Sequence, residues 1–486
     1  MVGSRGAVWR RNLFAALALL ALLCALPARA ARAANDEPWL TRATTYFTIY
    51  YTAAEADAVD HYAAEADELY AATAAVFDHG PAAPVALRLY PTGAAYADAN
   101  PIAGVLEGVV AHADARSGEI AVAVDRLARA GPAATRDTIR HELMHLVAAE
   151  LTADRLPVGF QEGLAQYAER EATDRERLVR ILERAEATGR LLSWDALNDR
   201  EHFLRRVNVA YPEALSVVSF LADRYGLGSL RRFMLDLGAA DRPWQDALAE
   251  TYGRAVDDLE ADWRAYLPDY YSGRWEINQI RSLDLSEARA QVAAGDYAAA
   301  RPRFEEARRL YADLEQPARV AEADRYLERI AAGLAAGELA AQGRARLTER
   351  SYTAARDLLA EADQRYAEAG DERARSALAE LLAAAERGAE AEASLAQATA
   401  LVATWRYPEG RQRSAEAAAL YRGLGDDDGW QRAQSLQGEA ESGQRRLALL
   451  LLAGGGILLV GLGVQQVRGR VAAPPARVTK EEGIAL

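Results

Sequence analysis

Two histidines four residues apart flank a glutamate in the segment His-Glu-Leu-Met-His at residues 141–145. The surrounding residues, 132–150, have the apolar spacing of a helix. Residues four apart share one face of a helix, so His141 and His145 can bind the same metal ion, and Glu142 can hold a water molecule beside it. The segment therefore predicts a zinc site that activates water for hydrolysis.

A third protein ligand must come from farther along the chain. A three-histidine site of the metzincin type needs glycine at 148 and histidine at 151, but these positions are Ala148 and Leu151. Glu162 opens a second predicted helix after a turn at Pro157 and Gly159, where its carboxylate completes a set of two histidines and one glutamate. We expect water as the fourth ligand. Three other acidic residues are lower-ranked rivals for the third position: Glu150, Asp154 and Glu169.

The elements that position this motif form an α+β unit. Three segments have the β-branched or alternating apolar residues typical of strands: 44–52, 84–90 and 119–124. Residues 53–78 have helical spacing, and nearly all segments after 132 are helical too. The strand at 119–124 is expected at a sheet edge, where an extended peptide can pair with it. We expect this domain over residues 35–268, followed by a linker at 269–282.

Several segments together resemble the gluzincin superfamily, specifically the peptidase MA-like metallopeptidase domain. They span Thr44 to about Leu267 and comprise the strand Tyr46–Tyr50, the motif helix, the second helix Pro157–Tyr167, the stretch Tyr211–Gly226 and the closing Asp262–Leu267. The resemblance implies a zincin-like fold in which His141, His145 and Glu162 hold one zinc ion and Glu142 is the general base. One departure is Gln166, where some gluzincins have an aspartate behind a histidine ligand, so the outer partner of that histidine is left open.

Tyr211 is a further candidate for catalysis. It precedes a helix at the position where the resembling domain keeps a tyrosine. A phenol at this position can donate a hydrogen bond to a developing oxyanion, which would stabilise the transition state. A buried packing role for the same ring is an equal alternative.

Composition excludes several classes of protein. The formal net charge of -14 and the pI near 5.2 disfavour a nucleic-acid partner, since phosphate binding needs a basic surface. Cys24 is the only cysteine and lies in an N-terminal apolar stretch, which excludes disulfide frameworks, thiolate zinc sites and a cysteine nucleophile. A chain of 486 residues is expected to contain two or three folded units.

Both ends of the chain have targeting features. Residues 1–34 have the parts of an export signal: basic residues, an apolar run and two Ala-Arg-Ala cleavage sites. The segment 447–467 begins with a long run, 447–464, in which no side chain is charged, and this run predicts one membrane-spanning helix. The basic excess after this segment places the disordered tail 468–486 in the cytoplasm. We therefore expect a single-pass cell-membrane protein with the bulk of the chain outside the cytoplasm.

Residues 283–445 repeat with a period of 55. Tyr297, Tyr352 and Tyr407 are 55 residues apart (352 − 297 and 407 − 352), and other tyrosine, arginine and alanine positions follow the same interval. Each of the three units has room for three helices. The array resembles tetratricopeptide-type helical repeats, although its interval is longer than that family's, and a plain helical stalk is the alternative. Stacked repeats of this kind commonly bind a protein partner on their concave face.

Together these features predict a membrane-anchored, extracytoplasmic zinc metallopeptidase that acts on a peptide or protein substrate. Zinc would polarise the scissile carbonyl, and Glu142 would take a proton from the attacking water and return it to the leaving amine. One alternative is a membrane-anchored scaffold whose repeats bind a partner while the zincin domain is catalytically silent. Another is a purely structural zinc, which an open three-ligand site disfavours.

Overall fold

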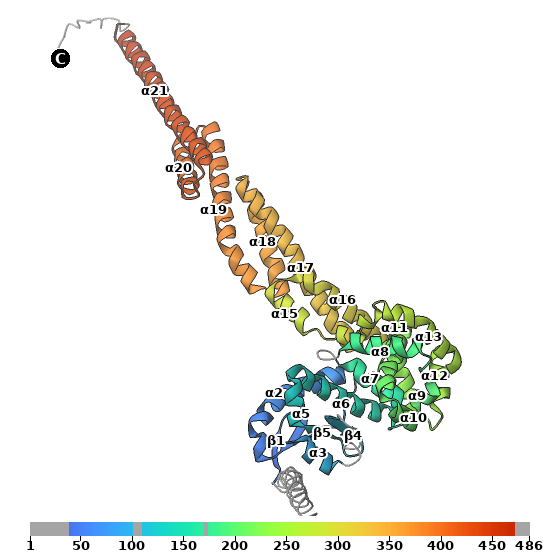
Figure 1. Ribbon diagram of the computed structural model, residues 1–486. Helices are drawn as coiled ribbons and strands as arrows, with labels where there is room; N and C mark the ends of the chain where they lie inside the picture. Colours follow the sequence, from blue (N-terminus) through green and yellow to red (C-terminus); the bar gives the residue numbers. More distant parts are fainter. Residues whose placement is uncertain (1–37, 101–108, 170–173, 472–486) are drawn as a thin grey trace, which may run out of the picture. The chain divides into compact units, whose positions relative to one another are not determined.

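The computed structural model describes residues 38–100, 109–169 and 174–471 (Figure 1). The chain divides into two compact units, each described here by itself: residues 1–290 with 299–327, and residues 291–298 with 328–486. The predicted linker at 269–282 thus belongs to the first unit, and the predicted repeat array is divided between the two. The expected export signal and residues 472–486 of the expected tail lie outside the described residues.

A five-stranded sheet with the order β1-β2-β3-β5-β4 forms one part of the first unit. The predicted strands are confirmed as a parallel set: β2 (Phe47–Tyr51), β3 (Val85–Tyr90) and β5 (Glu119–Ala123). Two short strands flank them in antiparallel pairing: β1 (Leu40–Ala43) and β4 (Ala111–Asp114). Because β5 pairs with β3 on one side and β4 on the other, the prediction of an edge strand at 119–124 is wrong.

Helix α6 (Pro132–Thr152) packs into two hydrophobic cores and confirms the predicted helix. Toward the sheet and α2 (Ala56–Phe77) it contributes three buried residues: Ile139, Leu143 and Leu146. Toward the helices that follow it contributes four others: Met144, Val147, Ala148 and Leu151. Both cores restrain α6, so a side chain on its remaining face is held in a fixed place.

Helices make up the rest of the first unit, and most of them surround the second core. Two short helices adjoin the sheet: α3 (Gly93–Ala99) and α5 (Val124–Ala130). The helices that follow α6 are α7 (Val158–Ala168), α8 (Arg175–Ala187), α9 (Trp194–Asn198), α10 (Arg200–Arg205), α11 (Val207–Ala239), α12 (Trp244–Tyr252), α13 (Val256–Tyr271) and α14 (Gln279–Ser282), and the next helix, α15 (Ser286–Ala294), is divided between the two units. The first unit therefore combines one small five-stranded sheet with a larger set of helices.

The repeat interval of the sequence reappears as pairs of helices. Three short helices begin at the three repeating tyrosines: α16 (Tyr297–Asp313), α18 (Tyr352–Ala369) and α20 (Tyr407–Gly423). Each is followed by a long helix that begins at the same interval: α17 (Pro317–Thr348), α19 (Glu372–Ala403) and α21 (Asp427–Val471). Each period therefore holds two helices and not three, because one uninterrupted long helix takes the place of two shorter ones.

The period of the tyrosines has a packing cause. The tyrosine that begins each short helix lies against a glycine of the long helix that follows, so that a Cβ atom on Gly388 would be 2.1 Å from the Tyr352 ring. The same contact joins Gly333 to Tyr297 and Gly443 to Tyr407. A bulky aromatic ring therefore requires a residue without a side chain opposite it, and the two recur together.

The prediction of a membrane-spanning helix at 447–467 is contradicted. Within the described part of the chain, no helix combines the length and the apolar composition that crossing a membrane requires. Residues 447–467 do not form a helix of their own but continue the long helix α21, which begins at Asp427 with polar and charged residues. The fold class is corrected accordingly to an α+β domain followed by helix pairs.

Candidate metal centre

The local sequence explains how α6 and α7 meet. Helix α6 ends at Thr152, and Pro157 provides the extended residue that precedes the first turn of α7. Helix α7 then packs closely on α11, because a Cβ atom on Gly163 would lie 2.3 Å from the carbonyl oxygen of Ala214. This close packing places Glu162, the residue before Gly163, opposite the histidines of α6.

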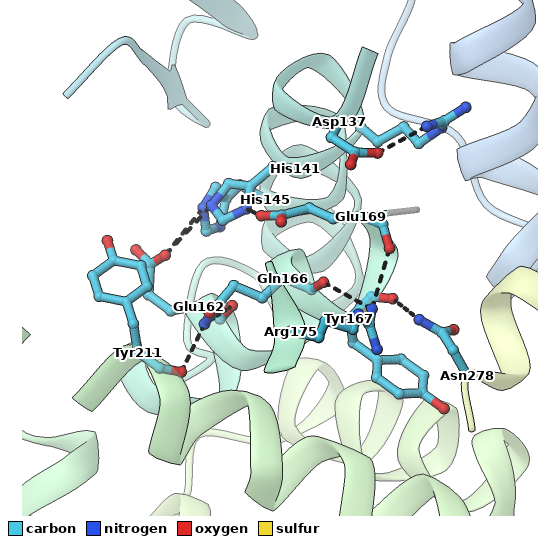
Figure 2. Close-up of polar contacts among 11 residues, drawn as sticks. Asp137, His141, His145, Glu162, Gln166, Tyr167, Glu169, Arg175, Tyr211 and Asn278 are labelled. Atoms are coloured by element: carbon cyan, nitrogen blue, oxygen red, sulfur yellow. Dashed lines mark hydrogen bonds and ion pairs between the residues drawn. The ribbon is translucent and has the colours of Figure 1, made fainter. Parts of the chain in front are cut away.

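The structure brings the predicted ligands together (Figure 2). The Oε2 atom of Glu162 lies 3.5 Å from Nε2 of His141 and 3.8 Å from Nε2 of His145. One nitrogen or oxygen from each of the three residues lies within 4.8 Å of the others. Ligands about 2.1 Å from a tetrahedral zinc ion are about 3.4 Å apart, so the observed separations leave room for such an ion at their centre.

A buried oxygen without a hydrogen bond supports the fit of a cation. Oε2 of Glu162 is buried and has no hydrogen-bond partner among the described residues, and its contacts with the two histidine nitrogens are longer than hydrogen bonds, or at their limit. A buried carboxylate oxygen without a hydrogen bond is costly, and a metal ion would provide the missing interaction. Two imidazoles and one carboxylate are also the donor set that suits zinc.

Glu169 lies behind the first histidine and not among the ligands. Its Oε1 atom is 2.8 Å from Nδ1 of His141, on the side of the ring opposite Glu162 (Figure 2). The guanidinium of Arg175 donates to the backbone carbonyl of Glu169 at 3.2 Å. A carboxylate in this position fixes the orientation and the tautomer of a metal-binding histidine. Glu169 thus takes the role that the sequence left open at Gln166.

Glu150 and Asp154, the two other candidates for the third ligand, and Gln166 do not contact the histidine pair. Glu150 is 2.9 Å from Nε2 of His79 and accepts a hydrogen bond from a backbone amide near the start of β3. Asp154 lies in the turn after α6, with a φ of 59°, and is not part of the metal-binding group. Gln166 donates to the backbone carbonyls of Glu162 and Tyr211, so it joins α7 to α11 without reaching a histidine ring nitrogen.

The burial of Glu142 determines its proton affinity. This side chain is 6% exposed, and the backbone amide of Ala113 in β4 donates to it. Burial, reinforced by the charge of Glu162, raises the pKa of Glu142 to about 7. Glu142 is therefore a buried carboxylate that a backbone donor holds in one orientation, next to the histidine pair.

Tyr211 lies beside Glu162 at the start of α11 (Figure 2). Its ring packs on Phe203 with the ring centroids 5.2 Å apart. Burial and the nearby carboxylates raise the pKa of Tyr211 well above its usual value, so the phenol remains protonated. The hydroxyl in turn helps to lower the pKa of Glu162. The residue therefore has a packing contact and a polar contact within the site.

The protonation states of the three candidate ligands, His141, His145 and Glu162, depend on one another. Burial lowers the pKa of His141, but Glu162 and Glu169 outweigh burial and hold that pKa well above its usual value. Burial lowers the pKa of His145 to about 4. Burial alone would raise the pKa of Glu162, but the two histidines lower it to about 2. The negative carboxylates thus favour a positive charge among the ligands, which a metal ion would supply in place of a proton.

Sequence reasoning did not identify two features of the site. The contact of Ala113 with Glu142 comes from β4, a short strand without β-branched residues. Glu169 was visible only as a rival ligand, although it follows Glu162 by two turns of a helix and hence shares the same face. That spacing places Glu169 on the same side as Glu162, but it does not by itself distinguish a metal ligand from a residue that contacts the far side of a histidine.

Comparison with known proteins gives one family. Residues 68–269, less than half of the chain, match the Peptidase MA superfamily. This match includes α6, α7 and Tyr211 and supports a zincin-like peptidase domain in the first unit. The superfamily is generally zinc-dependent, and a peptidase domain implies peptide or protein substrates. No curated protein and no solved structure is significantly similar to the chain.

Proposed function

We propose that the first unit is a zinc-dependent peptidase of the gluzincin type. The observation that carries this proposal is the group His141, His145 and Glu162, whose ligand atoms lie within 4.8 Å of one another and include a buried carboxylate oxygen without a hydrogen bond. The superfamily match supports the same activity. Zinc held by these residues would polarise the scissile carbonyl and acidify a water molecule.

Glu142 is the proposed general base. Its carboxylate would accept a proton from the attacking water and then return it to the leaving amine. The hydrogen bond from Ala113 and the surrounding core hold the carboxylate in one orientation. No covalent intermediate on the chain is required, which agrees with the lack of any cysteine other than Cys24.

Tyr211 is the proposed donor to the developing oxyanion. The raised pKa keeps its hydroxyl protonated, and the position beside Glu162 places that hydroxyl next to the ligand group. A donor that is already oriented stabilises negative charge in the transition state without further reorganisation.

One pair of variants tests this function. In Glu142→Gln, the chain should retain about one zinc ion while hydrolysis of a peptide library falls by about 10²–10⁴-fold, because the ligands remain and the base is lost. Glu150→Gln is the matched control, since Glu150 is on the same helix but contacts His79. Normal cleavage by Glu142→Gln would contradict the mechanism. A zinc-loaded wild-type chain that cleaves no peptide would favour the silent scaffold.

We also propose that the chain is exported, on the basis of the basic and apolar residues of segment 1–34 and its Ala-Arg-Ala sites. Expression with and without this segment, followed by cell fractionation, tests the location. Full-length protein that stays in the cytoplasmic fraction would contradict export.

A further inference from the structure

A cavity of about 390 Å³ lies in the second unit, outside the metal centre. Its volume is in the range of about 300–1,000 Å³ that is usual for ligand sites. Asp371, at the start of α19, is one of its wall residues and already accepts two hydrogen bonds. Oδ1 accepts from the backbone amide of Ala374 at 2.9 Å, and Oδ2 accepts from the hydroxyl of Tyr297 at 2.8 Å. We call this cavity the Asp371 pocket, and its principal wall residues are Gly295, Tyr297, Gly333, Gly337, Tyr366 and Asp371.

The following helix pair contains the same carboxylate arrangement with a cation bound to it. Asp426, one period after Asp371, accepts from the backbone amide of Gly429 at 2.9 Å and from the hydroxyl of Tyr352 at 3.1 Å. Its Oδ1 atom also accepts from the guanidinium of Arg350 at 2.8 Å. Arg350 makes a second contact of 2.7 Å with Asp428. The chain itself therefore shows which chemical group fits beside this carboxylate.

Two glycines explain why the Asp371 pocket is open. Gly295 stands one period before Arg350, and both residues have positive φ angles, 82° and 58°. A Cβ atom on Gly295 would lie 3.2 Å from Oδ2 of Asp371, so a side chain there would start toward the carboxylate. Gly337 likewise stands one period before Glu392, whose carboxylate accepts from backbone amides at the start of α18. Hydrogen atoms thus replace the two side chains that are present in the following pair.

The charges of the wall define the ligand further. Asp371 and Asp296 are acidic, and a carboxylate has about four lone-pair sites, so Asp371 can accept from a guanidinium in addition to its two present donors. Arg373 is the one basic wall residue and stands one period before Asp428, the second acidic contact of Arg350. Of the two acidic residues that contact Arg350 in the following pair, the pocket therefore has the equivalent of Asp426, which is Asp371. At the position equivalent to Asp428 it has Arg373, whose positive charge would repel a guanidinium.

We propose that the Asp371 pocket binds the side chain of an arginine presented by a partner polypeptide. That arginine would take the position that Arg350 occupies in the following pair and would donate to Asp371. The cavity is larger than one guanidinium requires, so it also has room for the backbone on either side of the arginine. The helix pairs, which we interpret as tetratricopeptide-like, would thereby recruit a protein independently of the metal centre.

The test uses a fluorescently labelled, blocked peptide with one arginine among alanine and serine residues. The matched ligand has citrulline in place of arginine, which keeps the shape and removes the charge. The full-length chain carries Glu142→Gln, so that the probe is not cleaved, and fluorescence anisotropy measures binding. We expect the arginine peptide to bind at least tenfold more tightly than the citrulline peptide, because a charge-assisted hydrogen bond is lost.

Three variants locate the binding. Gly295→Arg should weaken binding of the arginine peptide at least tenfold, because the new side chain would fill the pocket as Arg350 does in the following pair. Asp371→Asn keeps an oxygen for Ala374 and Tyr297 but removes the charge, and should weaken binding similarly if Gly295→Arg does not fold. Arg373→Asp recreates the two acidic contacts of the following pair and should strengthen binding several-fold.

Four results would overturn the proposal. Equal binding of the arginine and citrulline peptides would exclude a charge-specific site, and wild-type affinity in both Gly295→Arg and Asp371→Asn would exclude this pocket. No binding of the arginine peptide up to about 1 mM would exclude a specific site of useful affinity. Free L-arginine that binds as tightly as the peptide would indicate a small guanidinium ligand and would exclude a polypeptide partner as the reason for the site.

Discussion

The hydrogen bond between Glu169 and His141 makes a quantitative prediction about metal affinity. In Glu169→Gln, the amide oxygen can still accept from Nδ1 of His141, but the negative charge 2.8 Å from the ring is lost. The ring therefore keeps its orientation while the imidazole becomes a weaker electron donor. Because Glu169 contacts the far nitrogen and not the ligand group, the three proposed ligands remain intact.

The expected decrease in zinc affinity is larger than zero but smaller than the decrease caused by the loss of a ligand. Removing a carboxylate from behind a metal-binding histidine weakens metal binding by about 10–100-fold, which corresponds to about 1.4–2.7 kcal/mol. The contact is short and the side chain is only 19% exposed, so solvent screens little of the interaction. We therefore expect Glu169→Gln to raise the zinc dissociation constant by this factor.

Competition with a chelator of known zinc affinity measures the change. Glu176→Gln is the control, because Glu176 is on the neighbouring helix α8, is 68% exposed and pairs only with Arg180 among the ion pairs of the described residues. Unchanged zinc affinity in Glu169→Gln would refute a supporting role for this carboxylate. A loss as large as that of Glu162→Ala would show that Glu169 is a direct ligand.

Three further predictions concern stability and catalysis. Burial raises the pKa of the fully buried Glu213 from 4.5 to about 8, so its stabilising contribution is present below about pH 4.5 and is lost as the pH rises to 8. The effect of Glu213→Gln on the free energy of unfolding should therefore be more favourable at pH 7 than at pH 4 by about 3 kcal/mol. Denaturant unfolding of both chains at the two pH values measures this difference. Equal effects at both pH values would contradict this. Gly388→Ala should destabilise the helix pair of Tyr352 by about 1–3 kcal/mol in thermal unfolding, whereas Gly438→Ala, whose added Cβ atom would touch nothing, should not. Tyr211→Phe should lower kcat by about 10²-fold with little change in KM or zinc content if the hydroxyl stabilises the oxyanion, and unchanged kcat would assign the ring to packing alone.

Much of the candidate metal centre follows from local sequence signals. The proline that begins α6, the spacing of His141 and His145 and the turn at Pro157 are all determined by a few neighbouring residues, and the structure agrees with each of them. The role of Glu169 was not predictable in the same way, because it depends on how α7 crosses α6. That crossing is set by the close contact of Gly163 with α11, which is distant in sequence.

The remaining differences also have physical causes. Strands β1 and β4 have four residues each and contain only one large apolar side chain, Leu40, so their pairing depends on longer neighbours more than on their own residues. The spacing of the tyrosines indicates the repeat interval. Their partners Gly333 and Gly388 lie inside long helices, and from sequence alone a glycine at such a position lowers the prediction of a continuous helix. Contact with a tyrosine ring, and not a turn, is the reason for each glycine.

Zinc content tests the central claim most directly. The full-length chain is purified without added chelator, and metal analysis compares the wild type with Glu162→Ala and with the control Glu150→Gln. The arrangement of His141, His145 and Glu162 predicts about one zinc ion per chain in the wild type and the control, and a large loss in Glu162→Ala. A wild-type chain that binds no zinc when zinc is supplied, or equal zinc in Glu162→Ala, would contradict the proposed metal centre.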